Sequence, residues 1–245
     1  MKKKVVILGS KPNAYIPDVD YYYCANSAVG YYKESLKNCQ GKIINLVAAS
    51  EIVKSKRKSN DKEDWLKNKF KMIVDSDSDE IVLIGNEFFP NAESNISNNY
   101  LNPFSKLTFN EIERLSKLIT GFSWPIITKY HVIPLKLESV KNILKYFIDF
   151  CKYKTSKKHL SNGLFRPSTG IISLIYAIQI HGVNATYFIC GIGIKQRDKY
   201  PDGINNTWSP SKSMASFHVY ADKIILKKLK KKYDLRFDDI DFSNF

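Results

Sequence analysis

Short apolar segments alternate with glycine- or asparagine-bearing turns and helical segments, and this alternation limits the folds open to the chain. Buried strands are expected at residues 4–8, 21–24, 42–47, 80–85, 185–190 and 233–237, with a further short strand within 125–134. Helices are expected at residues 28–38, 64–73, 108–119, 139–153, 170–181 and 221–232. The pattern predicts an α/β fold with one Rossmann-like, mostly parallel, doubly wound sheet.

The length of 245 residues is sufficient for one large hydrophobic core, so residues 1–245 are expected to form a single α/β domain. Residues 194–216 are polar and longer than an ordinary connection, which favours a small lid inserted in that domain. Residues 90–103 are rich in Asn and Ser without periodicity and are expected to form a loop.

Cysteine usage and hydropathy exclude several classes. The four cysteines contain no C-x-x-C pair, so neither a zinc site nor a disulfide framework is indicated. No segment approaches the roughly 20 apolar residues of a membrane-spanning helix. We therefore expect a cytoplasmic protein, and the lysine-rich residues 227–232 leave open a peripheral position on the inner membrane.

The charge balance points to an anionic partner without choosing one. The chain carries 38 Lys and Arg against 24 Asp and Glu, a formal net charge of +14. Nucleic acid, an anionic membrane surface and a phosphorylated substrate all fit this excess, and lysine-rich usage in an AT-rich genome explains it equally well. No zinc-finger spacing or RNA-binding motif occurs, which argues against a dedicated nucleic-acid reader.

Two turns have the composition of ligand-binding loops. Gly9 ends the first strand, where open α/β sheets bind their ligands. The loop Arg166-Pro-Ser-Thr-Gly170 runs into an apolar helical segment, and a helix N-terminus with free N–H groups can hold an anion. The alternative is that Ser168 or Thr169 only caps a buried helix.

Taken in chain order, these segments resemble those of the bacterial family 42 sialyltransferases. That family has a lysine-led strand entering a G-N-G-P-S turn, an R-x-T-S-G loop opening a helix, a strand closing on S-G-I-D with two downstream tyrosines, and a histidine segment before a basic helix. The counterparts here are Gly9-Ser-Lys-Pro-Asn13, Arg166-Pro-Ser-Thr-Gly170, Cys190-Gly-Ile-Gly193 and His218-Val-Tyr-Ala-Asp222. The resemblance spans nearly the whole chain through short motifs.

The resemblance implies a GT-A-like variant of the Rossmann fold that transfers a sialic acid or related sugar from its CMP-activated form. His218 matches the general base, and its ordinary pKa of about 6.5 suits proton abstraction near neutrality. Tyr200 matches a lid tyrosine that hydrogen-bonds the leaving phosphate. The positions matched to donor binding are Gly9, Ser10, Asn26, Arg166, Ser168, Thr169, Gly170, Gly191 and Lys195. No metal or further cofactor is implied, and the acceptor is a glycan or glycolipid, as in lipooligosaccharide or capsule biosynthesis.

The chain departs from the family pattern at several positions. Ser10 stands where the family has asparagine, Lys11 replaces a glycine, Gly193 replaces an aspartate, and Lys195 lies near the first lid tyrosine. Residues 47–49 also lack the asparagine that ends the third family strand. These changes leave pseudaminic, legionaminic and 3-deoxy-octulosonic acid donors open beside sialic acid.

Two functions from other classes are alternatives to a transferase. A Rossmann-type oxidoreductase is disfavoured because no G-x-G-x-x-G motif follows the first strand. A non-catalytic protein that binds nucleic acid through its lysines remains open, and so does assembly into a homo-oligomer. Steep salt dependence of DNA or RNA binding would mark the nucleic-acid reading.

Overall fold

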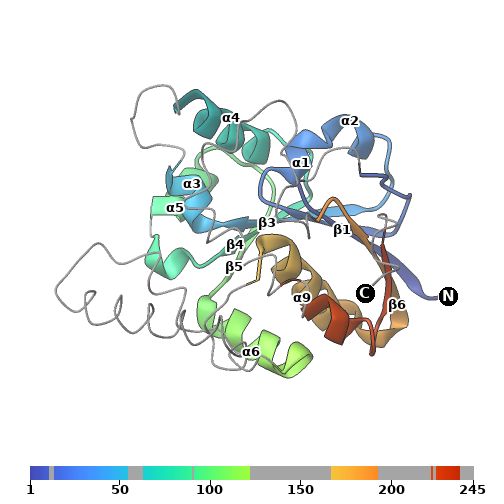
Figure 1. The fold of residues 1–245 in the computed structure, drawn as a ribbon. Coiled ribbons are helices and arrows are strands. Elements are labelled where there is room, and N and C mark those ends of the chain that lie inside the picture. The colour runs from blue at the N-terminus through green and yellow to red at the C-terminus, as the bar shows by residue number, and fades with distance from the viewer. Residues whose placement is uncertain are drawn as a thin grey trace.

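The computed structural model describes residues 1–10, 14–54, 63–89, 91–121, 167–192, 222 and 225–237. Within these residues seven parallel strands form one sheet in the order β5-β4-β3-β2-β1-β6-β7 (Figure 1). The strands are β1 Lys3–Leu8, β2 Tyr21–Ala25, β3 Lys42–Ala48, β4 Glu80–Ile84, β5 Phe104–Leu107, β6 Ala185–Cys190 and β7 Asp234–Phe237. The predicted α/β, Rossmann-like fold is confirmed.

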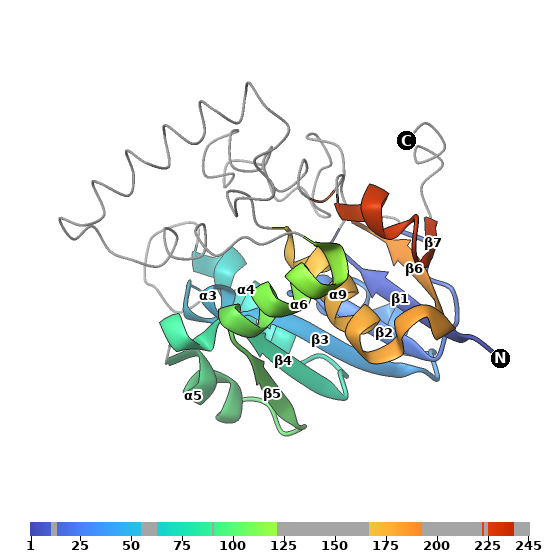
Figure 2. The same cartoon turned by 90° about the horizontal axis from the view of Figure 1, so that it is seen from below.

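Helices cover both faces of the sheet (Figures 1 and 2). One face carries α1 Ala28–Tyr31, α2 Lys33–Leu36, α3 Ala49–Lys54, α4 Glu63–Val74 and α5 Asn91–Ser97. The other face carries α6 Phe109–Thr120, α9 Thr169–His181 and helical residues 225–229. Short 3-10 turns follow β4 (η1, Asn86–Phe88) and α9 (η3, Gly182–Asn184). No helix among these described segments is long and apolar enough to cross a membrane.

Three local expectations need correction. Residues 90–103 are not simply a loop, because α5 forms there and buries Ala92 and Ile96 on one face. Strand β5 was not expected, since an edge strand is buried on fewer sides and Phe104–Leu107 shows no apolar run. The helix expected at 28–38 is two short helices separated at Tyr32.

Other expected elements lie outside the described residues. These are the strand within 125–134, the helix at 139–153 and the lid at 194–216. The C-terminal helix expected at 221–232 is described at residue 222 and at 225–229, where it is helical.

Helix α9 is buried along residues 170–178 except at the half-buried Tyr176, while Gln179 and Ile180 near its C-terminal end are exposed. Ile171, Leu174 and Ile178 are buried in the same core as strands β1 to β4. The same core takes Ile112 and Leu115 from α6 and residues 225, 226 and 229. Helix α9 therefore fills the layer between the sheet and the outer helices, so its ends are held in fixed positions relative to the strands.

Helix α6 begins at a capping box. The Thr108 hydroxyl accepts the Glu111 backbone N–H, and the Glu111 carboxylate accepts the Thr108 backbone N–H at 2.7 Å. The Thr108 N–H and hydroxyl both donate to this carboxylate, and they lower the pKa of Glu111 because they favour its ionised form. The helix ends at Gly121, which takes the left-handed conformation common at a C-cap.

The C-terminal end of α9 is tied to β2 through His181. Its Nε2 atom and the Tyr23 hydroxyl are 2.9 Å apart, and its ring centroid lies 4.5 Å from that of Tyr21. Burial lowers the pKa of His181, with a further lowering from the positive charge of Lys3. The folded protein therefore favours the neutral imidazole.

The lowered pKa of His181 makes stability depend on pH. Below pH 6.5 the unfolded chain takes up a proton that folded His181 resists, so the His181 contribution to stability falls as pH falls from about 7 to 5. His181→Gln keeps a polar partner for Tyr23 without titrating. We expect urea unfolding to show a smaller acid loss of stability in the variant than in the wild type. Equal slopes in the two proteins would contradict the prediction.

Candidate functional site

The carboxyl ends of β1 and β6 meet where the chain reverses its direction of travel across the sheet. After β1 the chain crosses to β2, and after β6 it crosses to β7 on the opposite side. The Gly9 N–H donates to the Cys190 carbonyl at 2.8 Å. A crevice at such a switch point is where open α/β sheets bind ligands.

Backbone alone forms the floor of this crevice. A Cβ atom added to Gly9 would lie 2.3 Å from the Gly191 carbonyl oxygen, which is too close for any side chain. Gly191 itself has φ of 63°. The two glycines therefore allow the ends of β1 and β6 to pack against each other, and both are buried.

Asn26 follows β2 at the same edge of the sheet and has φ of 54°, the one positive value among the described non-glycine residues. Its backbone N–H donates to the Leu46 carbonyl at 2.8 Å, and its Oδ1 accepts the Ala48 N–H at 2.9 Å. Its Nδ2 donates to the Thr169 hydroxyl at 3.1 Å. Asn26 therefore joins the ends of β2 and β3 to the start of α9.

The N-terminus of α9 faces this edge. Ser168 is the N-cap, with extended backbone, and its hydroxyl accepts the Ile171 N–H at 3.4 Å. Gly170 is buried against Ile192, since an added Cβ would lie 3.1 Å from the Ile192 Cδ1. Among the described residues no acceptor contacts the N–H groups of Thr169 or Gly170, so both donors face the carboxyl edge of the sheet.

A buried carboxylate lies against the same turn. Asp222 is 2% exposed, and its Oδ1 accepts the Ser168 N–H at 2.8 Å. Burial raises the pKa of Asp222 to about 7, while hydrogen bonds from Ser168 act in the opposite direction. The helical residue Asp222 is thus hydrogen-bonded to the beginning of α9.

The described part of the chain brings most of the predicted donor residues to one edge. Asn26 and Thr169 are in direct contact, and so are the backbones at Gly9 and Gly191. Ser168 and Gly170 belong to the same turn as Thr169, and Ser10 follows Gly9. The predicted His218, Tyr200, Arg166 and Lys195 lie outside the described residues.

Two polar residues of interest received no role from the sequence. Asp222 ends the segment His218-Val-Tyr-Ala-Asp222, and its place four residues after His218 is the sequence feature that could have drawn attention to it. Asn45, in the middle of β3, is fully buried, and its side-chain amide has no hydrogen-bond partner among the described residues. No sequence pattern distinguishes Asn45 from a surface asparagine.

The other features that suggest a site lie elsewhere or are absent from the described residues. A pocket of about 560 Å³, lined in part by Gly41, Lys42 and Asp79, lies at the amino ends of β3 and β4, away from the edge described above. The described residues contain no group of three or more His, Cys, Asp or Glu side chains that could hold a metal ion. The carboxyl edge therefore remains the candidate site.

Comparison with known proteins adds no family assignment. No family model, no curated protein sequence and no solved structure matches the chain significantly.

The Asn26 conformation can be tested with a matched pair of variants. Asn26→Gly removes the side-chain bonds to Ala48 and Thr169 but tolerates positive φ, whereas Asn26→Ala removes the bonds and adds strain. We expect Ala to be less stable than Gly by roughly 1 kcal/mol, measured by chemical unfolding. If Ala were as stable as Gly, the left-handed conformation would not constrain this position.

Asp222 gives a pH dependence of the opposite sign to His181. Its folded pKa of about 7 exceeds the unfolded value of about 3.9, so its contribution to stability is present below pH 4 and is lost as pH rises towards 7. Asp222→Asn cannot titrate. The stability of this variant relative to wild type should increase from pH 4 to 7, with a slope of at most about 1.4 kcal/mol per pH unit. A constant difference would show that the carboxyl ionises normally.

Proposed function

We propose that the protein is an inverting glycosyltransferase that moves a sialic acid, or a related nonulosonic acid, from a CMP-activated donor to a hydroxyl of a glycan or glycolipid. The observation that carries the proposal is the hydrogen bond from Asn26 to Thr169. It joins two segments of the sialyltransferase-like pattern that are 143 residues apart, at the edge of the sheet where α/β enzymes bind nucleotides. CMP-activated 3-deoxy-octulosonic, pseudaminic and legionaminic acids are alternative donors for the same site.

The start of α9 has the groups needed to bind the donor phosphate. The N–H groups of Thr169 and Gly170 are unoccupied among the described residues, and the helix dipole places partial positive charge there. The Thr169 oxygen accepts from Asn26, so its own proton is free to be donated to a ligand. Such donors stabilise the negative charge that develops on the departing CMP.

The switch point suits the nucleotide. The ends of β1 and β6 are packed together at Gly9 and Gly191, and a ribose or phosphate group would bind beside them at the carboxyl edge of the sheet. The neighbouring Ser10, which is half-buried, offers a hydroxyl there.

In the proposed reaction an acceptor hydroxyl attacks the anomeric carbon of the sugar as the bond to the CMP phosphate oxygen breaks. His218 takes the hydroxyl proton, and CMP leaves with the bonding electrons. His218 precedes Asp222 by four residues in the sequence. Tyr200 would donate to the leaving phosphate, and Lys195 would offset its charge.

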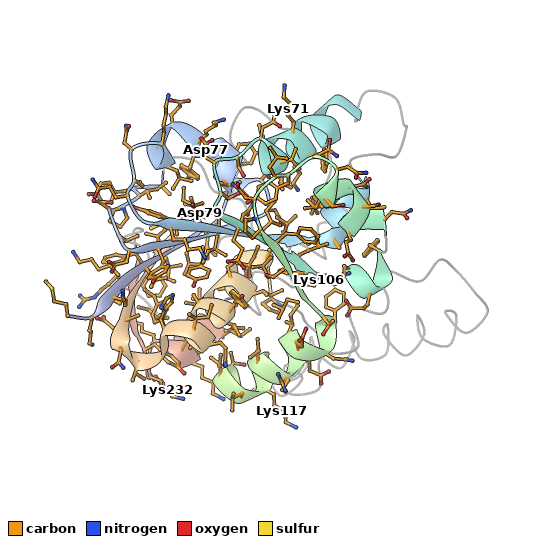
Figure 3. All side chains as sticks on the ribbon, turned by 180° about the vertical axis from the view of Figure 1, so that it is seen from behind. Lys71, Asp77, Asp79, Lys106, Lys117 and Lys232 are labelled. Carbon is orange, nitrogen blue, oxygen red and sulfur yellow. The ribbon has the colours of Figure 1, made fainter. Side chains whose placement is uncertain are left out.

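The basic surface fits an acceptor at an anionic membrane. Lys227, Lys230, Lys231 and Lys232 are exposed on the C-terminal helix and the turn after it. Lys232 and the α6 residue Lys117 lie on the α6 and α9 side of the sheet (Figure 3). We propose a cytoplasmic enzyme that can attach peripherally to the inner membrane, where a glycolipid acceptor would be presented.

A panel of nucleotides tests the donor class directly. We expect CMP to raise the melting temperature of the full chain, because a ligand that binds only the folded state stabilises it by mass action. UDP, GDP and NAD should give little or no shift, and the CMP shift should persist at high salt. A shift with NAD alone, or salt-sensitive binding to generic DNA or RNA in place of CMP, would replace the proposal with the corresponding class.

Removal of the proposed base tests the chemical step. His218→Ala should lower transfer from CMP-sialic acid by at least about 100-fold, which is the lower range for general-base catalysis, and leave the affinity for CMP nearly unchanged. His131→Ala changes the same residue type at a position with no proposed role and serves as the control. Full transfer activity in His218→Ala would exclude His218 as the base.

A further inference from the structure

We propose that Asp222 is a positioning residue of the candidate site, whose carboxylate fixes the first turn of α9 relative to the C-terminal helix. The inference rests on the proposed function for its catalytic meaning. Its structural part is independent of any ligand, because it concerns one hydrogen bond between two described residues, Asp222 and Ser168.

The contact joins parts of the chain that are far apart in sequence. Asp222 Oδ1 and Ser168 N are 2.8 Å apart across 54 residues of chain. Asp222 is helical and stands close to the buried Ile225 and Leu226, which belong to the core that also holds α9. The C-terminal helix therefore has its N-terminal end fixed at the same point as the start of α9.

Accepting one backbone N–H with a buried carboxylate has a high desolvation cost. A serine hydroxyl, an asparagine amide or water can accept such a bond without the desolvation of a carboxylate. At 2% exposure Asp222 bears this cost with Ser168 as its only hydrogen-bond partner among the described residues. Buried ionisable groups that serve no stabilising ion pair are concentrated at functional sites.

The contact is the first in a continuous series of hydrogen bonds across the candidate site. Asp222 accepts from Ser168, the next residue Thr169 accepts from Asn26, and Asn26 accepts from Ala48 at the end of β3. A displacement at Asp222 would shift the N-cap of α9 and with it the hydroxyl of Thr169. The donor groups of the candidate site are in this way held by one framework.

Two substitutions of Asp222 in the full chain separate the effect of its hydrogen bond from the effect of its charge. Asp222→Ala removes the acceptor, and we expect CMP affinity to fall by about tenfold, the equivalent of one lost hydrogen bond to a charged group. Asp222→Asn keeps an oxygen that can accept the Ser168 N–H, so CMP affinity should remain within about threefold of wild type. Wild-type affinity in folded Asp222→Ala, or failure of Asn to rescue it, would overturn the proposal.

Asp79→Ala is the matched control. The Asp79 carboxylate also accepts a backbone N–H, that of Ile43 at 2.7 Å, and lies in the turn between α4 and β4 (Figure 3). Its loss should lower the melting temperature without changing CMP affinity or transfer.

Hydrogen exchange supplies a readout that needs no ligand. Asp222→Ala should accelerate amide exchange in peptides covering residues 167–175 and leave residues 42–48 unchanged, with the reverse pattern in Asp79→Ala. If Asp222→Ala does not fold, Ser168→Pro replaces it, since Pro fits the Ser168 φ of −63° and removes the same N–H. Ser168→Ala is then its control, because it removes the hydroxyl alone.

The outcomes for the two proposals are distinguishable. If the wild type binds no CMP, the proposed function fails, and hydrogen exchange still decides whether Asp222 positions α9. If CMP binds and exchange at residues 167–175 is the same in wild type and Asp222→Ala, the positioning role is overturned while the transferase proposal stands.

Discussion

The enclosure of α9 is the constraint on which the rest of the structure depends. Most of the helix, residues 170–178 apart from Tyr176, is buried between the sheet and the outer helices, so this part of it turns no polar face to water. Its first turn must obtain hydrogen bonds from whatever strands and loops meet it there. Asp222, the Ser168 hydroxyl and Asn26 supply these bonds at the carboxyl edge of the sheet. The two N–H groups without an acceptor among the described residues lie in that same turn.

The central strands could be predicted because each is buried on both faces and reads as an apolar run. β1, β3, β4 and β6 are of this kind, and the helix at 170–181 was recognised by length and composition. Strand β5 could not be recognised, because an edge position permits Ser105 and Lys106. Helix α5 was hidden by its asparagines and serines, since only Ala92 and Ile96 face the core.

The candidate site was predictable in part. Glycine turns and a hydroxyl-bearing loop indicate a ligand edge, because parallel strands bring their carboxyl ends together. The pairing of Asn26 with Thr169 could not be read from spacing, since it depends on how α9 packs against β2. Asp222 illustrates the same limit, because sequence shows an acidic residue at a helix start and burial alone shows its unusual chemistry.

The pairing of β1 with β6 has a consequence for how the chain is made. Residues 3–8 pair in register with residues 185–190, so β1 has only β2 beside it until the last quarter of the chain is available. At ribosomal rates of about 5–20 residues per second, that interval is roughly 10–40 seconds. During it, one edge of a strand whose Val5, Val6, Ile7 and Leu8 are fully buried in the native sheet is open to other chains. Sheet closure is therefore a late and non-local event, and the nascent N-terminal half is the part most in need of protection from aggregation.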